Sequence, residues 1–242
     1  MTAEPSLRSA RSALGDRLVA AAAELALPLS SAQTDRLLDF VGLLNRWNHT
    51  YNLTAVRDPA DMLTQHLVDC LAAVAPLRRE APGPRLLDVG SGGGLPGIVW
   101  AILDPDREVT CVDSVGKKAA FVQQAALALR LGNLRSEHGR VERLQAGPFD
   151  VVSSRAFASL PDFVALTRRL LKDDGVWLAM KGKVPQDEIS GLDVGTVVFH
   201  VEHMKVPGLA AKRCLIWMRK VMTSMNYKES MRSPSRQPAE PG

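Results

Sequence analysis

The chain contains 242 residues, of which 46% are hydrophobic and 23% are charged, and its formal net charge is +4 at pH 7. This length and composition predict one domain of moderate size with a sizeable buried core. The sequence contains no run of about 18 apolar residues and no apolar segment followed by a small-residue cleavage site, so we expect neither a membrane span nor a secretory signal.

Three helices are expected in the first 80 residues, over residues 7–27, 30–47 and 58–74. Alanine and leucine at helical spacing predict the first of them. Ser30 and Gln33 form an S-x-x-Q capping box for the second, and Asp58 caps the third. Residues 48–57 are polar and predict a loop. The sequence therefore predicts an N-terminal helical extension over residues 1–80, packed on the core.

From residue 81 the pattern changes to short apolar strands that alternate with helices. Strands are expected over residues 85–89, 109–112, 149–153, 176–180, 197–201 and 213–218, and helices over 95–103, 117–131 and 161–171. A weaker strand precedes Val141, and the Asp-Asp-Gly triplet at 173–175 predicts a turn. This alternation is typical of an α/β fold whose mostly parallel sheet is covered on both faces, so we expect a Rossmann-like domain with seven strands over residues 81–221. The tail 222–242 is rich in Ser, Pro and charge and is expected to be disordered.

Charge and cysteine placement give two weaker indications. From Val201 onward the chain carries 8 of its 30 Lys and Arg and 3 of its 26 acids, a local charge of +5 against −1 for the rest. A basic end on a nearly neutral body favours binding of a polyanion, although a solvated tail without a partner has the same pattern. Cys70, Cys111 and Cys214 show no paired spacing, so we expect core thiols in a reducing cytoplasm and no metal site.

A glycine-rich segment, DVGSGGGLPG over residues 88–97, lies between the first expected strand of the α/β part and the helix after it. Glycines there allow positive φ and a close approach of the backbone to a ligand, and the helix N-terminus supplies free N–H groups. Asp113, at the end of the next strand, can accept both hydroxyls of a ribose. The segment and this acid together predict a nucleoside-containing cofactor at the carboxyl edge of the sheet.

Two cofactors compete for this loop. A dinucleotide site requires G-x-G-x-x-G, but counted from Gly90 the last position is Leu95, and counted from Gly92 the pattern lies two residues too late. The spacing Asp-x-Gly-x-Gly-x-Gly, from Asp88 to Gly94, fits without adjustment and resembles the first motif of S-adenosylmethionine methyltransferases. A methyltransferase is therefore favoured, with a dinucleotide-dependent oxidoreductase and a tight turn without a ligand as alternatives.

Short strings along the chain together resemble one family. They are NLTAVRD from Asn52, HLVD from His66, LPGI within the glycine loop, DS from Asp113 followed by Lys117 and Lys118, RVE from Arg140, SRAFASL from Ser154, KG from Lys181, and a final PG from Pro207 followed by Arg213. Their order and spacing, from about Leu37 to Met218, resemble the ribosomal RNA small subunit methyltransferase G family, also called glucose-inhibited division protein B. The resemblance implies methyl transfer from S-adenosylmethionine to N7 of guanine 527, in the 530 loop of bacterial 16S ribosomal RNA.

The resemblance and the glycine motif together nominate a cofactor site that consists of Asp88, Gly90, Gly92, Gly94, Leu95, Asp113, Ser114, Val141, Glu142 and Arg155. The leading acid would orient the loop, Gly90 would admit the methionine part, and Asp113 would take the ribose hydroxyls. The backbone of Val141 and the carboxylate of Glu142 would read adenine. Arg155 follows a strand at the carboxyl edge, and a surface salt bridge is its alternative role.

The residues expected to contact RNA are Asn52, His66, Lys117, Lys118 and Lys181. Lysines at a helix start oppose the helix dipole, which favours a role beside RNA phosphates; ordinary solvated lysines are the alternative. A packed, hydrogen-bonded helix residue is the alternative for His66. Guanine N7 carries a lone pair and no proton, so no general base is expected. The protein is expected to act as a monomer, and its expected partner is 16S ribosomal RNA or the small ribosomal subunit. A non-catalytic RNA-binding assembly factor is the second alternative function.

Overall fold

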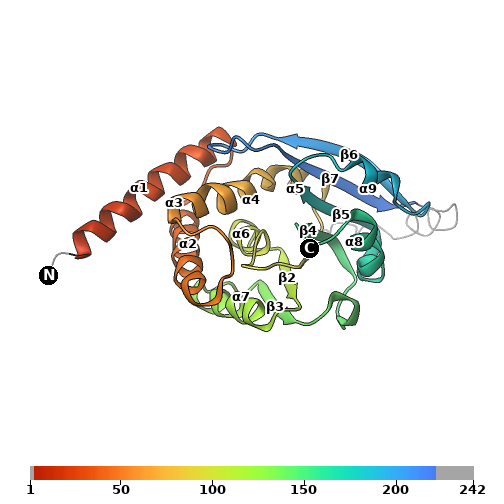
Figure 1. Ribbon diagram of the computed structural model, residues 1–242, viewed down its shortest axis with the longest axis horizontal. Coiled ribbons are helices and arrows are strands. Elements are labelled where there is room, and N and C mark those ends of the chain that lie inside the picture. Colours follow the sequence, from red (N-terminus) through yellow and green to blue (C-terminus); the bar gives the residue numbers. More distant parts are fainter. Residues whose placement is uncertain (1–2, 222–242) are drawn as a thin grey trace, which may run out of the picture.

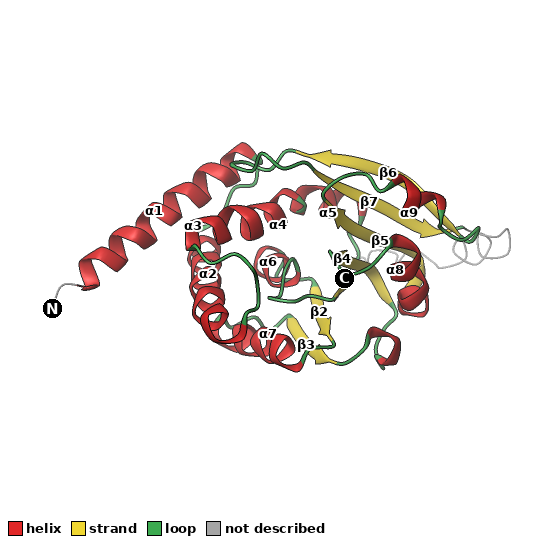
Figure 2. Cartoon of the chain, in the orientation of Figure 1, coloured by secondary structure: helices red, strands yellow, loops and turns green. Residues whose placement is uncertain are grey.

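A seven-stranded sheet forms the centre of the protein, of which the computed structural model describes residues 3–221 (Figure 1 and Figure 2). The strands are β1 (Arg85–Val89), β2 (Glu108–Asp113), β3 (Leu134–His138), β4 (Phe149–Arg155), β5 (Leu171–Lys181), β6 (Thr196–Met204) and β7 (Arg213–Lys220). Their spatial order is β3-β2-β1-β4-β5-β7-β6; β7 runs antiparallel to both neighbours and the other pairs are parallel. The sheet confirms the expected α/β fold. The tail 222–242, expected to be disordered, lies outside the described residues.

Helices fill most of the first 80 residues. They are α1 (Ala3–Glu24), α2 (Ser31–Tyr51), α3 (Pro59–Met62), the π-helical segment η1 (Leu63–Val68), α4 (Asp69–Ala72) and α5 (Val74–Glu80). The capping box is confirmed: Gln33 N donates to Ser30 Oγ at 3.2 Å, and Ser30 N donates to Gln33 Oε1 at 3.0 Å. Asp58 caps α3 as expected, but the single helix expected to end near residue 74 is a series of short helices that includes a π-helical turn and ends at Glu80.

The remaining helices cover the two faces of the sheet. They are α6 (Gly97–Leu103), α7 (Gly116–Ala128), η2 (Val141–Arg143), α8 (Leu160–Thr167), η3 (Arg168–Leu170) and α9 (Gln186–Ser190), the last of which was not expected. Successive residues of β1 point to opposite faces, so Leu86 joins one core with the N-terminal helices, α6 and α7, whereas Leu87 joins a second core with α8. The buried Trp100 of α6 also donates to Cys70 O of α4 at 3.2 Å. The N-terminal helices therefore share a core with the sheet.

The prediction of a turn at residues 173–175 is wrong, because strand β5 runs through these residues. The register between β4 and β5 shifts at this point, so β5 accommodates extra residues. Lys220 of β7 donates to Asp173 Oδ1 at 2.9 Å and holds the irregular stretch against the sheet. A Cβ on Gly175 would lie 2.9 Å from Asp150 O, so this glycine permits a close approach of two strands.

Candidate functional site

The glycine-rich loop joins β1 to α6 at the carboxyl end of the sheet. Gly90, Gly92 and Gly94 have φ angles of +66°, +57° and +76°, in the left-handed region that favours glycine. Gly90 also lacks room for a side chain, because a Cβ there would lie 2.5 Å from the ring of Phe157. The loop therefore presents backbone alone at Gly90.

A buried carboxylate holds this loop. Asp88 is 0% exposed; its Oδ2 accepts a hydrogen bond from Gly97 N at 2.9 Å, and its Oδ1 accepts one from Ser153 Oγ at 3.2 Å. Burial raises the pKa of Asp88 to about 7, although both hydrogen bonds favour the charged form. Asp88 orients the loop and lines neither of the two cavities above it.

Two adjoining cavities lie over the loop, at the carboxyl ends of β1, β2 and β4, where parallel α/β sheets bind ligands. The larger cavity has a volume of about 500 Å³ and the smaller one about 330 Å³. Gly90, Lys118 and Ala156 line both. The glycine loop thus lies where one cavity passes into the other, and an elongated ligand could occupy both.

The smaller cavity contains the acid that ends β2. Asp113 Oδ2 accepts from Gly92 N at 2.9 Å, and its Oδ1 accepts from Val115 N at 2.8 Å. A carboxylate oxygen has two lone pairs, so each oxygen of Asp113 can accept a further hydrogen bond. The expected residues Ser114, Val141 and Glu142 line the same cavity. This concentration of hydrogen-bonding groups suits a nucleoside.

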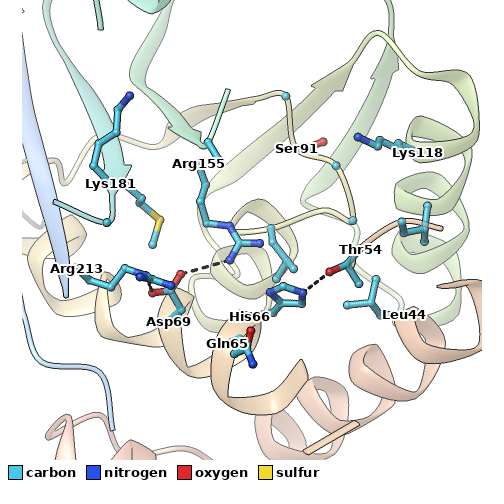
Figure 3. A pocket seen from close by; sticks show the side chains of 18 residues that line it. Leu44, Thr54, Gln65, His66, Asp69, Ser91, Lys118, Arg155, Lys181 and Arg213 are labelled. Carbon is cyan, nitrogen blue, oxygen red and sulfur yellow. Dashed lines mark hydrogen bonds and ion pairs between the residues drawn. The ribbon is translucent and has the colours of Figure 1, made fainter. Parts of the chain in front are cut away.

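In the larger cavity a carboxylate lies between two guanidinium groups (Figure 3). Asp69, the first residue of α4, is 2% exposed; Arg155 Nη1 lies 3.3 Å from its Oδ2, and Arg213 Nε lies 2.8 Å from its Oδ1. Arg155 ends β4 and Arg213 begins β7, so the cluster joins three distant parts of the chain. Neither Asp69 nor Arg213 was expected at the site, although both lie in the strings that carry the family resemblance.

His66, on η1, lies beside Arg155 in the larger cavity (Figure 3). Its Nε2 lies 2.6 Å from Thr54 Oγ1, and its Nδ1 is buried without a hydrogen-bond partner among the described residues. Burial, and after it the charge of Arg155, lower the pKa of His66 to about 4. His66 is therefore neutral at pH 7, with one ring nitrogen held by Thr54.

The lysines expected beside RNA differ in their surroundings. Lys118 lines both cavities, whereas Lys117 is exposed and lines neither. Lys181 lines the larger cavity, but its Nζ donates to Glu188 Oε2 at 2.9 Å and to Ala158 O at 3.0 Å. Lys181 thus ties the segment that follows β4 to α9, and Lys118 is the lysine with access to both cavities.

The expected residues that line neither cavity are Asp88, Gly94, Asn52 and Lys117, whereas Gly92 and Leu95 line the larger one. Gly94 serves the turn itself, because a Cβ there would clash with Ile98. Asn52 ends α2 in the left-handed conformation, and its Oδ1 accepts from Arg57 Nη2 at 2.6 Å. The polar lining residues Thr54, Gln65 and Arg140 were not expected, since single polar residues at a loop or turn have no distinctive pattern.

Within residues 3–221, none of the helices has both the length and the apolar character that a membrane span requires. The same residues contain no group of three or more His, Cys, Asp or Glu side chains placed to hold a metal ion. Cys70, Cys111 and Cys214 are buried and free, as expected of core thiols, and burial raises the pKa of each thiol.

The sheet order, the glycine loop and the acid that faces it from β2 define the class of S-adenosylmethionine-dependent methyltransferases. Solved structures share this fold. TrmN from Thermus thermophilus is 19% identical with a TM-score of 0.50, and the match covers 66% of this chain and 53% of that chain. A SAM-dependent methyltransferase from Aquifex aeolicus is 14% identical with a TM-score of 0.51, and the match covers 66% of this chain and 93% of that chain. At these identities the likeness concerns the fold alone, and it confirms the expected Rossmann-like methyltransferase architecture.

The family model for rRNA small subunit methyltransferase G matches residues 33–217. Proteins named ribosomal RNA small subunit methyltransferase G are 60% identical in Paracidovorax citrulli (87% of this chain, 91% of that protein), 61% in Acidovorax sp. strain JS42 (81% and 91%) and 58% in Leptothrix cholodnii (84% and 94%). The chain belongs to the ribosomal RNA small subunit methyltransferase G family. This membership confirms the resemblance of the short strings and decides for a methyltransferase over a dinucleotide-dependent oxidoreductase.

Proposed function

We propose that the protein transfers a methyl group from S-adenosylmethionine to N7 of guanine 527, in the 530 loop of 16S ribosomal RNA. The observation that carries the proposal is the pair of adjoining cavities over the glycine loop, one rich in hydrogen-bonding groups and one lined by cations. Relatives named ribosomal RNA small subunit methyltransferase G support the RNA substrate. The nucleotide and its N7 atom are those that the family resemblance implies.

The residues present fit the cofactor. Its adenosine half fits the smaller cavity, where Asp113 can accept the ribose hydroxyls and Val141 and Glu142 can pair with adenine. Its methionine half fits the larger cavity beyond Gly90, where the missing Cβ permits close approach, and Arg155 offers a guanidinium to its carboxylate. Gly92, Leu95 and Ser114 complete the contacts, and Asp88 and Gly94 shape the loop. When bound, the cofactor supplies an electrophilic methyl group on a sulfonium.

The chemistry of the larger cavity agrees with an acceptor that has no proton to lose. Among its lining residues in the described part of the chain, the only carboxylate is Asp69, which is paired with two arginines. Burial lowers the pKa of His66 to about 4, so its imidazole is a weak base. Leu44 and Leu53 give the cavity apolar surface against which a nucleobase can pack. The chain then contributes alignment of the reactants and exclusion of water.

RNA phosphates would lie beside Lys117 and Lys118, at the start of α7, where Lys118 lines both cavities. Asn52 and His66 would lie nearer the target base. Lys181 contributes less to this contact, because Glu188 already pairs with it. The partner is 16S ribosomal RNA or the small ribosomal subunit in the cytoplasm, and the protein acts as a monomer.

The test is methyl transfer from labelled S-adenosylmethionine to small ribosomal subunits and, in parallel, to naked 16S ribosomal RNA. We expect label in a guanine of the 530 loop, located by strand cleavage at the N7-methylated base after borohydride and aniline treatment. RNA that binds without gaining label at saturating cofactor would favour a non-catalytic assembly factor instead. Calorimetric titration with NAD is the matched control, for which we expect no binding.

A further inference from the structure

Asp69 links the N-terminal helices to the larger cavity (Figure 3). Its side chain is 2% exposed and lies between the guanidinium groups of Arg155 and Arg213, at 3.3 Å and 2.8 Å. The partners stand 86 and 144 residues away in the sequence. Helix α4, strand β4 and strand β7 must all be in place before this cluster exists.

The charges of the cluster favour an anion in the cavity. One carboxylate faces two guanidinium groups, so the cluster keeps a net charge of +1, and both arginine side chains are partly exposed at 22% and 25%. A buried carboxylate without partners is strongly disfavoured, so Arg155 and Arg213 hold Asp69, and Asp69 in turn keeps the two cations together. Part of the Arg155 guanidinium is thereby fixed by Asp69, and the rest is free for a ligand.

We infer that Asp69 is a positioning residue for S-adenosylmethionine, which sets the guanidinium of Arg155 against the carboxylate of the methionine half. This inference rests on the proposed function, because it takes the larger cavity as the methionine site. Without the charge of Asp69, Arg155 and Arg213 repel each other and Arg155 turns toward solvent. Binding of a ligand with an amino-acid carboxylate then depends on Asp69, whereas binding of the adenosine half does not.

The variant Asp69→Asn tests this, because the amide keeps the shape of the side chain and removes its charge. Calorimetry compares two ligands: S-adenosylhomocysteine, which carries the carboxylate, and 5′-methylthioadenosine, which lacks the amino-acid part. We expect Asp69→Asn to weaken the binding of S-adenosylhomocysteine about tenfold or more, and to change the dissociation constant of 5′-methylthioadenosine by less than about twofold. If Asp69 had a purely structural role, the variant would bind both ligands more weakly by the same factor.

Asp104→Asn is the matched control. Asp104 also lies between two arginines, with Arg78 Nη2 at 2.6 Å and Arg107 Nε at 3.5 Å, but it lines neither of the two cavities. We expect this variant to bind both ligands within about twofold of the unchanged protein. The control therefore distinguishes the general effect of removing an arginine-paired carboxylate from the specific effect of removing Asp69.

A mutant cycle asks whether Asp69 acts through Arg155. If it does, the double variant Asp69→Asn/Arg155→Ala binds S-adenosylhomocysteine as weakly as Arg155→Ala alone. The inference is overturned if Asp69→Asn binds both ligands as the unchanged protein does, or if it weakens the binding of both equally. It is also overturned if the losses of binding free energy from the two single variants add in the double variant.

If the Asp69→Asn variant does not fold, the variant Arg155→Lys provides the test instead. Lysine keeps the positive charge but lacks the planar guanidinium that can contact two carboxylates at once. We expect a selective loss of S-adenosylhomocysteine binding there too, and undiminished binding would overturn the inference. If the unchanged protein binds neither ligand, the proposed function fails and not the role of Asp69 alone.

Discussion

Asp113 Oδ2 accepts a hydrogen bond from Gly92 N at 2.9 Å, so an acid at the end of β2 holds the glycine loop that follows β1. The second oxygen of the same carboxylate accepts from Val115 N at 2.8 Å. Asp113 therefore shapes the loop, and in the proposed function it also offers lone pairs to a ribose. Its replacement is expected to affect cofactor binding through both contacts.

Asp113→Ala is expected to weaken S-adenosylhomocysteine binding by about 1–3 kcal/mol, because charge-assisted hydrogen bonds are lost. Calorimetry measures this change. Asp113→Asn keeps the volume but turns an NH₂ group toward one of two N–H donors, so we expect a loss nearly as large. An unchanged dissociation constant for Asp113→Ala would mean that the ribose binds elsewhere.

Gly90→Ala is expected to lower cofactor affinity and stability together. Left-handed backbone costs a non-glycine residue about 1–2 kcal/mol, and the new Cβ would also meet the ring of Phe157 at 2.5 Å. Gly132→Ala is the matched control, because no heavy atom lies within 4 Å of its Cβ position. Calorimetry and thermal unfolding compare the two variants. Equal cofactor affinities would show that ligand does not approach the backbone at Gly90.

Asp88→Asn is expected to change the pH dependence of stability. The pKa of Asp88 is raised from 3.8 to about 7, so between these values the folded protein holds a proton that the unfolded chain releases. This contribution is present below pH 4 and is lost as the pH rises to 7. The amide can accept from Gly97 and donate to Ser153, so the variant should gain roughly 2–4 kcal/mol relative to the unchanged protein between pH 4 and pH 8. Urea unfolding across this range measures it, and a difference that is constant with pH would contradict the raised pKa.

Lys118→Met is expected to weaken RNA binding and its dependence on salt. A lysine beside a phosphate contributes about 0.7–0.9 to the slope of log K against log salt concentration, and Lys118 lines both cavities. Lys181→Met should change the slope less, because Glu188 already neutralises that ammonium. Filter binding to 16S ribosomal RNA at several salt concentrations compares them. Equal slopes for Lys118→Met and the unchanged protein would remove Lys118 from the RNA surface.

Features with local causes could be predicted from the sequence. The capping box at Ser30 depends only on neighbouring residues, and the glycine at position 90 indicates by its residue type alone that a positive φ is allowed there. The contact of Asp69 with Arg213 depends on strand β7 entering the sheet beside β5, which local spacing does not encode. The expected turn at 173–175 failed for the same reason, since tertiary pairing held an Asp-Asp-Gly triplet in a strand. The division into parts at 1–80 and 81–221 stays a prediction.

The contact between Asp69 and Arg213 has a consequence for biosynthesis. Asp69 leaves the ribosome early, whereas Arg213 is translated 144 residues later. A nascent chain that has already made β1 to β5 still lacks one of the two cations at the carboxylate of α4. On the role inferred for Asp69, binding of the methyl donor therefore requires β7, and a product that terminates before Arg213 lacks one of the two cations that hold this carboxylate.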